Sequence, residues 1–223
     1  MITVTATEGI HSRTSREHVD APLVFVVDDD VSVRESLEGM IEASGWQPET
    51  FASAREFLAH PRALVPSCLI LDVALPDLNG LDVQKRVAAD WPDMPIIFIT
   101  GRSDAWTIVQ AMKGGAIEFL LKPFHEETLI AAIRHAIERS RRALAHRAQL
   151  TALHGSYSSL TPREREVLLL VVSGLLNKQV GFELGISEIT VKAHRGQVMR
   201  KMNADSLPAL VTMAARLGLP TAA

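Results

Sequence analysis

The chain has 223 residues, of which 47% are hydrophobic and 22% charged, so its size and composition fit a globular protein of one large or two modest domains. No apolar stretch approaches the roughly 18 residues that a membrane-spanning helix needs, and the single cysteine, Cys68, excludes a disulfide framework within the chain. We therefore expect a cytoplasmic protein with no membrane partner, and we expect Cys68 in its core because it lies in the apolar run SCLILDV.

The formal net charge of −3 conceals two parts of opposite sign. Residues 21–140 carry 10 Lys and Arg against 18 Asp and Glu, a balance of −8. Residues 141–223 carry 11 Lys and Arg against 5 Asp and Glu, a balance of +6. A basic part joined to an acidic part indicates that the C-terminal part meets a polyanion such as nucleic acid.

Residues 1–20 are polar, without hydrophobic periodicity or the apolar core of a secretory signal, so we expect a flexible N-terminal arm. From residue 21 onward, apolar runs alternate with amphipathic segments. The runs predict strands at 23–27, 47–51, 68–73, 95–100 and 118–122, and the segments predict helices at 32–44, 53–60, 81–90, 104–115 and 126–140. Strands that are apolar throughout are buried on both faces, so this part predicts an α/β domain with a doubly wound parallel sheet.

Two details of the helices are also predicted. Ser32 and Glu35 form an S-x-x-E capping box at the start of the first helix, and Gly45 ends it. After residue 140 the sequence is rich in Ala, Arg and Leu and extends the last helix as a linker. A stripe along that helix forms either a dimer seam or part of a solvated linker; its members are Leu129, Ile133, Ala136, Ser140 and Ala143. The segment GSYSSL at 155–160 is expected to break the helix.

The remainder of the chain is expected to be helical throughout. Thr161 as N-cap, Pro162 at the first helical position and Glu164 as the capping-box partner start one helix. A short helix at 177–184, a tight turn at Gly185 and a basic helix at 188–202 capped by Ser187 follow, and an amphipathic helix occupies 206–217. Two helices across a three-residue turn are typical of a helix-turn-helix DNA-binding domain, which is the second, smaller, all-α domain.

Polar residues stand where the strands end. Asp28, Asp29 and Asp30 follow the first strand, Asp72 ends the third, and Thr100 and Lys122 end the fourth and fifth. Ligands of such sheets bind beyond the carboxyl ends of the strands. Carboxylates gathered there suit Mg²⁺, while a hydroxyl and an ammonium group suit the oxygens of a phosphoryl group. One carboxylate then remains as a nucleophile toward phosphorus, and Asp72 on the central strand is the natural candidate.

The segments VVDDD, LDVALPDLNG, IIFITG and FLLKPF, in this order and spacing, resemble the receiver domain of two-component response regulators. The segment LTPREREVLLLVVSGLLNKQVGFELGISEITVKAHRGQVMRKM resembles the LuxR-type helix-turn-helix output domain, and the whole is similar to the NarL/FixJ family, its FixJ-like branch above all. The resemblance implies the strand order 2-1-3-4-5. It also implies an arm at 1–20, a receiver domain at 21–138, a helical linker at 139–155 and a DNA-binding domain at 156–223.

The resemblance further implies roles for individual residues. Asp72 is implied to be the phosphoacceptor, phosphorylated by a sensor histidine kinase, with Mg²⁺ (or Mn²⁺ in its place) as cofactor. The implied metal ligands are Asp28, Asp29, Asp72 and the backbone carbonyl of Ala74. Lys122 and Thr100 are implied to bind the phosphoryl group. Phe119 is implied to be the aromatic switch residue coupled to Thr100. The bond between Lys122 and Pro123 is often cis in this family. Asp30 is expected to serve the start of the first helix.

Such a protein binds a double-stranded DNA promoter, forms a homodimer on phosphorylation and catalyses only its own phosphoryl uptake and loss. The fourth receiver helix carries dimer contacts in the family, so Trp106 is either an exposed anchor there or a partly buried aromatic, and the helix at 206–217 is a second dimer face. Because Ala74 has no side chain to position water, we expect a long-lived phosphoryl group.

The helix at 188–202 divides into two faces. Spacing assigns Ile189, Val191, Val198 and Met202 to the core, and Lys192, Arg195, Gly196 and Met199 to the opposite face, where Lys and Arg read guanine edges or bind phosphates. Lys178, Ser187 and Thr190 are expected to meet backbone phosphates. His194 either joins them or faces the core.

Two other functions use the same residues. Asp28 and Asp30 have the D-x-D spacing of haloacid-dehalogenase-type phosphatases, so a metal-dependent phosphatase is an alternative. A receiver-like domain that no longer accepts phosphate, in a DNA-binding or adaptor protein, is another. A dinucleotide-binding enzyme is disfavoured, because DDDVSV stands where a glycine-rich loop would be required.

Overall fold

The structure is a computed structural model that describes residues 21–62, 64–101 and 104–221. Contacts divide the chain after Leu144 into two compact units, each of which is described by itself. The boundary falls within the range 139–155 that the sequence assigns to the linker, whereas the expected arm lies outside the described residues. None of the helices described is both long enough and apolar enough to span a bilayer.

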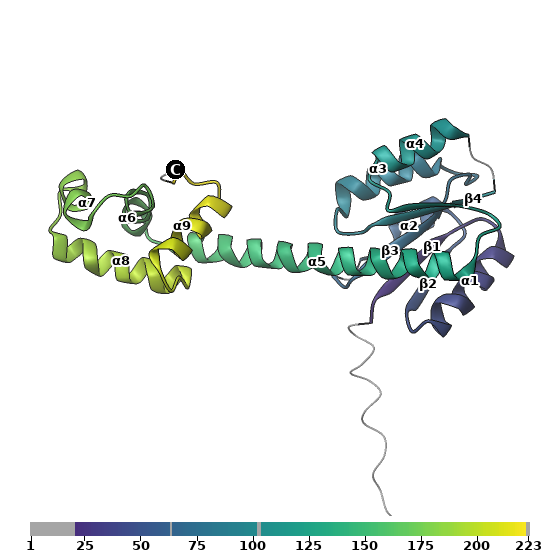
Figure 1. Ribbon diagram of the computed structural model, residues 1–223, viewed down its shortest axis with the longest axis horizontal. Coiled ribbons are helices and arrows are strands. Elements are labelled where there is room, and N and C mark those ends of the chain that lie inside the picture. Colours follow the sequence, from purple (N-terminus) through teal and green to yellow (C-terminus); the bar gives the residue numbers. More distant parts are fainter. Residues whose placement is uncertain (1–20, 63, 102–103, 222–223) are drawn as a thin grey trace, which may run out of the picture. The chain divides into compact units, whose positions relative to one another are not determined.

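The first unit is built on a parallel sheet of five strands in the order β2-β1-β3-β4-β5 (Figure 1). The strands are β1 (Leu23–Val27), β2 (Gln47–Phe51), β3 (Ser67–Asp72), β4 (Ile96–Thr100) and β5 (Glu118–Leu121). Every pairing is parallel, and the register places Val27 beside Leu71 and Thr100 beside Leu121. The predicted fold class and strand order are confirmed, and the carboxyl ends of β1, β3, β4 and β5 meet at one edge.

Helices cover both faces of this sheet. They are α1 (Val31–Ala43), α2 (Ala54–Ala59), α3 (Gly80–Asp90), α4 (Ala105–Lys113) and α5 (Glu126–Ser158). One apolar core joins the sheet to α2, α3 and α4, and a second joins it to α1 and the first part of α5. Because the central strands β1, β3 and β4 are buried along their full lengths, their apolar side chains fill both cores. Cys68 is fully buried in the second core, as predicted.

The start of α1 differs from the predicted capping box. Asp30, not Ser32, is the N-cap residue, and its carboxylate accepts a hydrogen bond of 2.8 Å from the backbone N–H of Ser32. Aspartate caps helices as well as serine does, and starting the helix at Val31 leaves Glu35 beyond the position that a capping-box partner needs. The prediction that Asp30 serves the helix start is confirmed, and Gly45 adopts the positive φ of 84° expected where the helix ends.

Helix α5 also corrects two expectations. Leu129, Ile133, Ala136 and Ser140 are fully buried within the first unit, so they form neither a dimer seam nor a solvated face. The first three pack in the core that α5 shares with α1. The buried hydroxyl of Ser140 accepts a hydrogen bond of 3.0 Å from the backbone N–H of Ser67, the first residue of β3. These four residues therefore lie on the side of α5 that packs on the first unit, whereas Ala143, the last residue of the stripe, is half-buried.

The helix does not break at residue 155. It continues through Gly155 to Ser158, and the chain turns at residues 159–160. Leu153 is buried and Tyr157 half-buried in an apolar core of the second unit. This packing outweighs the cost of a glycine in a helix, which is about 1 kcal/mol relative to alanine.

The second unit is helical. It contains α6 (Pro162–Val172), α7 (Asn177–Leu184), α8 (Glu188–Met202) and α9 (Leu207–Arg216). Thr161 and Glu164 form the predicted capping box, Ser187 caps α8, and Gly185 turns the chain between α7 and α8 with a φ of 65°. Glu164, a buried carboxylate, also accepts a hydrogen bond of 2.7 Å from Lys201 of α8. This pair ties the start of α6 to the end of α8.

An aromatic cage around Arg62 closes the α2 side of the first unit. The guanidinium group lies 3.9 Å from the ring centre of Phe57 and 4.6 Å from those of Phe25 and Trp91. It donates a hydrogen bond of 2.6 Å to the backbone oxygen of Phe57. Burial lowers the pKa of Arg62 to about 10, and the charge of Glu49 acts in the opposite direction, so the group stays cationic at neutral pH. Cation–π contacts of this kind stabilise by about 0.5–2 kcal/mol.

Candidate functional site

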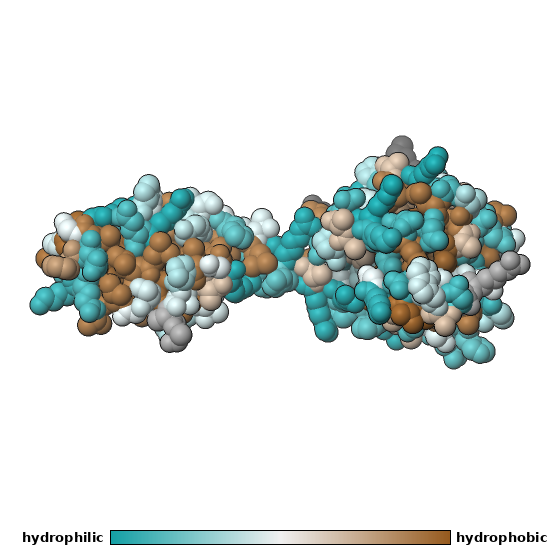
Figure 2. Space-filling view, turned by 90° about the horizontal axis from the view of Figure 1, so that it is seen from above, coloured by the Kyte–Doolittle hydropathy of each residue, from teal (hydrophilic) through white to brown (hydrophobic). Residues whose placement is uncertain are grey.

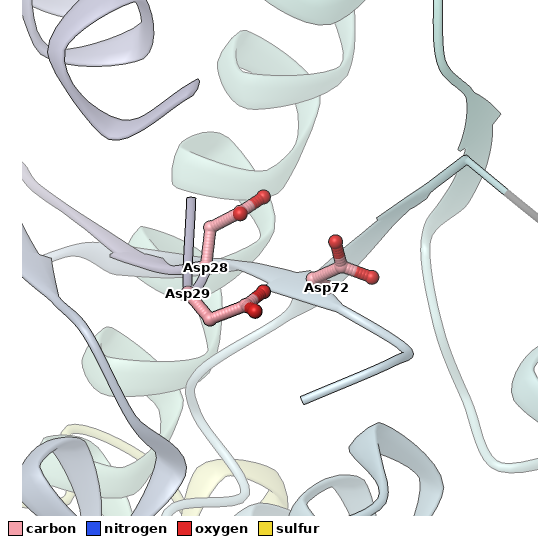
Figure 3. Close-up of side chains that lie close together, drawn as sticks. All are labelled: Asp28, Asp29 and Asp72. Atoms are coloured by element: carbon pink, nitrogen blue, oxygen red, sulfur yellow. The ribbon is translucent and has the colours of Figure 1, made fainter. Parts of the chain in front are cut away.

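Three carboxylates meet at the carboxyl edge of the sheet. Asp28 and Asp29 follow the last residue of β1, and Asp72 is the last residue of β3 (Figure 3). Their ligand atoms all lie within 4.8 Å of one another. Asp28 is fully buried, Asp72 is nearly so, and Asp29 is exposed. An arrangement of oxygen donors open to solvent on one side suits Mg²⁺, which keeps several of its waters.

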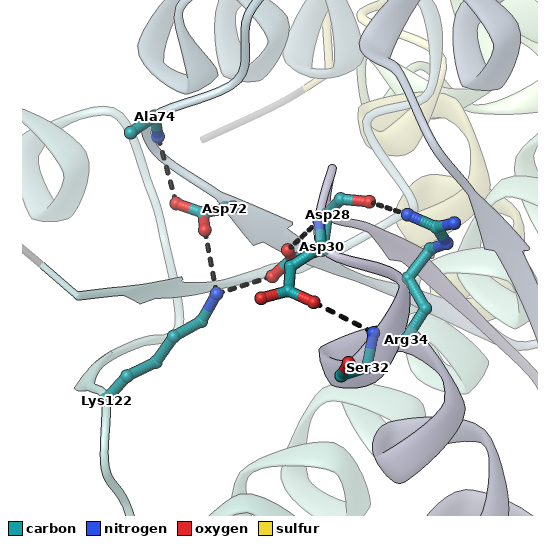
Figure 4. Close-up of polar contacts among 7 residues, drawn as sticks. All are labelled: Asp28, Asp30, Ser32, Arg34, Asp72, Ala74 and Lys122. Atoms are coloured by element: carbon teal, nitrogen blue, oxygen red, sulfur yellow. Dashed lines mark hydrogen bonds and ion pairs between the residues drawn. The ribbon is translucent and has the colours of Figure 1, made fainter.

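Lys122 provides the cation at this edge. Its Nζ donates hydrogen bonds of 2.8 Å to Asp72 and 2.5 Å to Asp28, so it bridges the two buried carboxylates (Figure 4). Burial alone would lower the pKa of Lys122, but its hydrogen bonds to Asp28 and Asp72 outweigh burial and raise it. Burial raises the pKa of Asp28, while Lys122 opposes that rise. The bond between Lys122 and Pro123 is cis, as the resemblance implies.

Backbone groups fix the orientation of the acids. Asp72 accepts a hydrogen bond of 2.9 Å from the backbone N–H of Ala74, and Asp28 accepts one of 3.0 Å from Asp30 (Figure 4). Arg34 donates to the backbone oxygen of Asp28 at 2.7 Å. Ala74 itself is exposed. The turn after β3 therefore holds one oxygen of Asp72 while the other faces Lys122.

The two remaining predicted residues of the site lie on β4 and β5. Thr100 is the last residue of β4 and is 1% exposed. Phe119 lies on β5, half-buried, with its ring centre 5.9 Å from that of Phe98 on β4. The structure thus brings Asp28, Asp29, Asp72, Thr100 and Lys122 to one edge, with Phe119 beneath it on the α3–α4 side.

Asp30 caps helix α1 and is not part of the acid cluster. Its carboxylate accepts the N–H of Ser32 at the start of α1, and it lies outside the cluster of acids that could hold a metal (Figure 4). A D-x-D phosphatase would require this second aspartate at the reacting group. The geometry therefore favours a site built from Asp28, Asp29 and Asp72 over one built from Asp28 and Asp30.

The predicted DNA-contacting residues divide by exposure. Lys178 of α7 and Ser187, Thr190, Lys192 and Gly196 at or on α8 are exposed, whereas His194 and Arg195 are half-buried. Arg195 donates a hydrogen bond of 3.1 Å to Asn177, so it links α8 to α7. Lys192 pairs with Glu188 one turn earlier, at 3.0 Å.

Two assignments on α8 are wrong. Ile189, expected in the core, is 79% exposed, and Met199, expected on the outer face, is half-buried against a core of the second unit. Val191, Val198 and Met202 are buried as predicted. The outer face also carries residues that the sequence reading missed: Ala193, Gln197 and Arg200. The charge of Arg200 could have identified it as a DNA-contacting candidate from sequence. Its guanidinium group donates a hydrogen bond to the side chain of Gln197.

A parallel sheet in the order 2-1-3-4-5 with a cluster of acids and a lysine at its carboxyl edge, joined to a helix-turn-helix domain, defines a class of protein. It is the class of response regulators that act as transcription regulators.

Comparison with known proteins identifies the family. Residues 24–134 match the family described as "Response regulator receiver domain", and residues 158–214 match "Bacterial regulatory proteins, luxR family". Nodulation protein W of Bradyrhizobium diazoefficiens is 45% identical over 95% of this chain and 92% of its own length. Transcriptional regulatory protein FixJ of the same organism is 37% identical over 88% and 96%. The structure of response regulator StyR superposes with a TM-score of 0.80, at 44% identity over 88% of this chain and 99% of its own. The chain belongs to the response regulators of the NarL/FixJ type.

Proposed function

We propose that this response regulator is switched on by phosphorylation of Asp72, with Mg²⁺ as cofactor and a sensor histidine kinase as donor. The observation that carries the proposal is the position of Asp72, whose carboxylate lies between the backbone N–H of Ala74 and the ammonium group of Lys122. It is the acid of the cluster that ends the central strand β3.

The transfer itself needs few groups. A carboxylate oxygen of Asp72 attacks the phosphorus of a phosphohistidine, the P–N bond breaks, and the imidazole nitrogen takes up the electron pair. The nucleophile in this step is the carboxylate form of Asp72, so the step transfers no proton from it. The ammonium group of Lys122 then binds one phosphoryl oxygen. The hydroxyl of Thr100, at the end of β4, donates a hydrogen bond to another. The chain catalyses only this uptake and the later loss of its own phosphoryl group.

The donor set fits a magnesium ion. Asp28, Asp29 and Asp72 offer carboxylate oxygens close together. The backbone carbonyl of Ala74 would be the fourth donor. When bound, the ion supplies positive charge that offsets the repulsion among the acids and the charge of the phosphoryl oxygens. Mn²⁺, which accepts the same oxygen donors, is expected to substitute.

A groove beside the acids suits the kinase. It has a volume of about 380 Å³ and lies between α1 and the segment after β5. Its walls include Leu37 and Met40 of α1, Lys122, and Pro123 with Phe124. A helix that carries a phosphohistidine could rest on these apolar groups with its imidazole directed at the edge of the sheet. The partner that we propose for this groove is a helical histidine phosphotransfer surface of the sensor kinase.

Phosphorylation would favour a dimer through the face formed by α4 and β5. Trp106, Val109 and Met112 lie on one side of α4, and Leu121 lies at the end of the adjacent β5; all are exposed. Thr100 and Phe119 connect this face to Asp72. Thr100 ends β4, the strand between β3 and β5, and Phe119 lies on β5 itself. Movement of both toward a phosphoryl group would shift the population of an existing second arrangement of this face. Pairing of two receivers would bring two output domains onto neighbouring half-sites of a promoter. Helix α9 would form the contact between the output domains. The protein would act in the cytoplasm.

The test compares wild type with Asp72→Asn in a DNA-binding assay with acetyl phosphate and Mg²⁺. We expect acetyl phosphate to increase promoter affinity of the wild type and to leave Asp72→Asn unchanged. Equal stimulation of both proteins would refute the proposal and favour a receiver that no longer accepts phosphate.

Asp30→Asn is the matched control. Asparagine caps a helix about as well as aspartate, so α1 stays intact. Full stimulation is expected in this variant, whereas a phosphatase of the D-x-D type would lose its activity. A turnover assay with a small phosphoester separates the two functions directly, and no catalytic turnover is expected.

A further inference from the structure

Ile189 occupies an unusual place for a large apolar side chain. It is the second residue of α8 and is 79% exposed, and the exposed lysine Lys192 follows one turn later. The surface of the C-terminal unit carries both apolar and polar side chains (Figure 2). In helix-turn-helix proteins the N-terminal residues of the second helix contact base edges in the major groove. Ile189 is therefore at the position where such contacts are made.

The fold gives no reason for isoleucine at this site. Val191, two residues later, is fully buried and supplies the core contact of this turn. A β-branched residue also has a lower helix propensity than the unbranched polar residues common on exposed helix faces. A contact with a ligand of the helix would give this side chain a role that the fold does not.

Gly196 on the same exposed face raises the same question. A Cβ added there would meet no heavy atom within 4 Å, so the fold does not require glycine. Glycine in a helix interior costs about 0.5–1 kcal/mol relative to alanine. The small size of Gly196 would allow a partner to approach the helix surface closely at this position.

The base edges offer one apolar group in the major groove, which is the C5 methyl of thymine. A β-branched side chain in a helix keeps essentially one χ1 rotamer, so Ile189 presents its methyl groups at little cost in side-chain entropy. Lys192, one turn along the helix from Ile189, is a cation that complements a DNA phosphate, and Arg200 adds a second cation in the last turn of α8. Lys192 favours DNA over an apolar protein partner, because lysine is depleted in protein–protein interfaces.

We propose that Ile189 is a specificity-determining residue that reads the C5 methyl of a thymine, with Gly196 at a point of close approach between α8 and the DNA. The proposal rests on DNA binding by α8 and is independent of how Asp72 is controlled. It predicts that the preferred site contains a thymine, in each half, whose methyl group matters only while Ile189 is present.

The test uses the full-length protein with acetyl phosphate and Mg²⁺. A preferred site is first selected from random double-stranded DNA, and each thymine in one half is then replaced singly by deoxyuridine, which lacks only the methyl group. Affinities are measured by fluorescence anisotropy at one fixed salt concentration. At one position the wild type should lose affinity about fourfold, the factor that corresponds to burying one methyl group.

The variants decide between explanations. Ile189→Ser should bind the thymine and deoxyuridine sites equally well, and Ile189→Val should keep most of the difference. Phe182→Ser, at an exposed apolar residue of α7, should keep all of it. A second probe places cytosine or 5-methylcytosine at the same position, and the methyl should favour the wild type only.

Three outcomes would overturn the inference: a wild type indifferent to methyl removal at every thymine, an Ile189→Ser variant that retains the penalty, or no selected sequence at all. An Asp72→Asn variant that responds to acetyl phosphate like the wild type would refute the proposed control instead and leave the role of Ile189 standing.

Discussion

The ammonium group of Lys122, at the end of β5, lies 2.8 Å from the carboxylate of Asp72, at the end of β3. The same nitrogen contacts Asp28, so one cation serves two buried acids at the carboxyl ends of the paired strands β1 and β3. The exposed Asp29 adds a further negative charge beside them. The edge of the sheet therefore carries more negative than positive charge, and it stores the repulsion that a divalent cation would relieve.

Magnesium should stabilise the receiver domain. At a concentration 100 times its dissociation constant, the ion should add about 2.7 kcal/mol to the free energy of unfolding. Asp29→Asn should lose most of this effect, and without metal it should be at least as stable as the wild type because one like charge is gone. Thermal unfolding in Mg²⁺ and in a chelator measures both. An undiminished metal effect in the variant would exclude Asp29 as a ligand.

The phosphoryl group on Asp72 should be lost slowly. Ala74 contributes only a backbone N–H toward Asp72 and has no side chain that could orient a water molecule. Ala74→Gln supplies an amide at this exposed position and should speed the loss on the order of tenfold by positioning water. Decay of a radiolabelled phosphoprotein gives the rates. Loss from the wild type within seconds would contradict the prediction.

Trp106→Ala should weaken the phosphorylation-dependent dimer at least about tenfold, the effect expected of a central aromatic anchor. Trp106 is 65% exposed, so its removal should leave the fold of the receiver unchanged. Sedimentation velocity with acetyl phosphate follows the dimer, and Arg86→Ala on the exposed side of α3 serves as the control. Equal dimerisation of Trp106→Ala and wild type would move the contact to another face.

The output domain should lose stability in mild acid through Glu164. The hydrogen bond from Lys201, together with the capping bond from Thr161, lowers the pKa of Glu164 below its usual value of 4.5. A carboxylate whose pKa is lower in the folded state stabilises the fold above its unfolded pKa, and this contribution disappears as the pH falls through the folded value. Glu164→Gln should be less stable near pH 7 and should show a weaker decline below pH 4.5. Parallel pH profiles of unfolding for both proteins would argue against this pair.

Ser140→Ala should destabilise the receiver domain by about 1–3 kcal/mol, because the buried N–H of Ser67 would lose its acceptor. Ser36→Ala, at an exposed position of α1, should change stability by less than about 0.5 kcal/mol. Denaturant unfolding compares the two variants. A Ser140→Ala protein as stable as the Ser36→Ala protein would mean that another acceptor replaces the hydroxyl.

The strand-end site could be anticipated from sequence for a physical reason. Buried parallel strands end at one edge, so the residues after them converge even when they are far apart in the chain. Asp28 and Lys122 lie 94 residues apart, yet their positions relative to the strands were enough to bring them together. The sequence predicts that Asp30 serves the start of α1, but it does not predict that Asp30 rather than Ser32 is the N-cap residue. Both residues are good caps, and only tertiary packing fixes the first turn.

Other features depended on packing that the sequence does not display. The stripe on α5 has the spacing of a dimer seam and of a buried face alike, and only the sheet beneath it distinguishes them. Ile189 and Val191 are both apolar and two residues apart, so periodicity alone could not decide which one faces the core. The aromatic cage of Arg62 is formed by Phe25, Phe57 and Trp91, which come from three separate segments of the chain. The sequence around Arg62 therefore does not predict it.

The burial of Cys68 has a practical consequence. Its thiol is fully enclosed by the receiver core, and burial raises its pKa, so thiol reagents should not reach it in the folded protein. It is also the only cysteine of the chain. A cysteine introduced on each unit could therefore carry a spectroscopic probe without removal of the native residue. Distances between such probes, followed as acetyl phosphate is added, would report directly how the signal changes the placement of the two units.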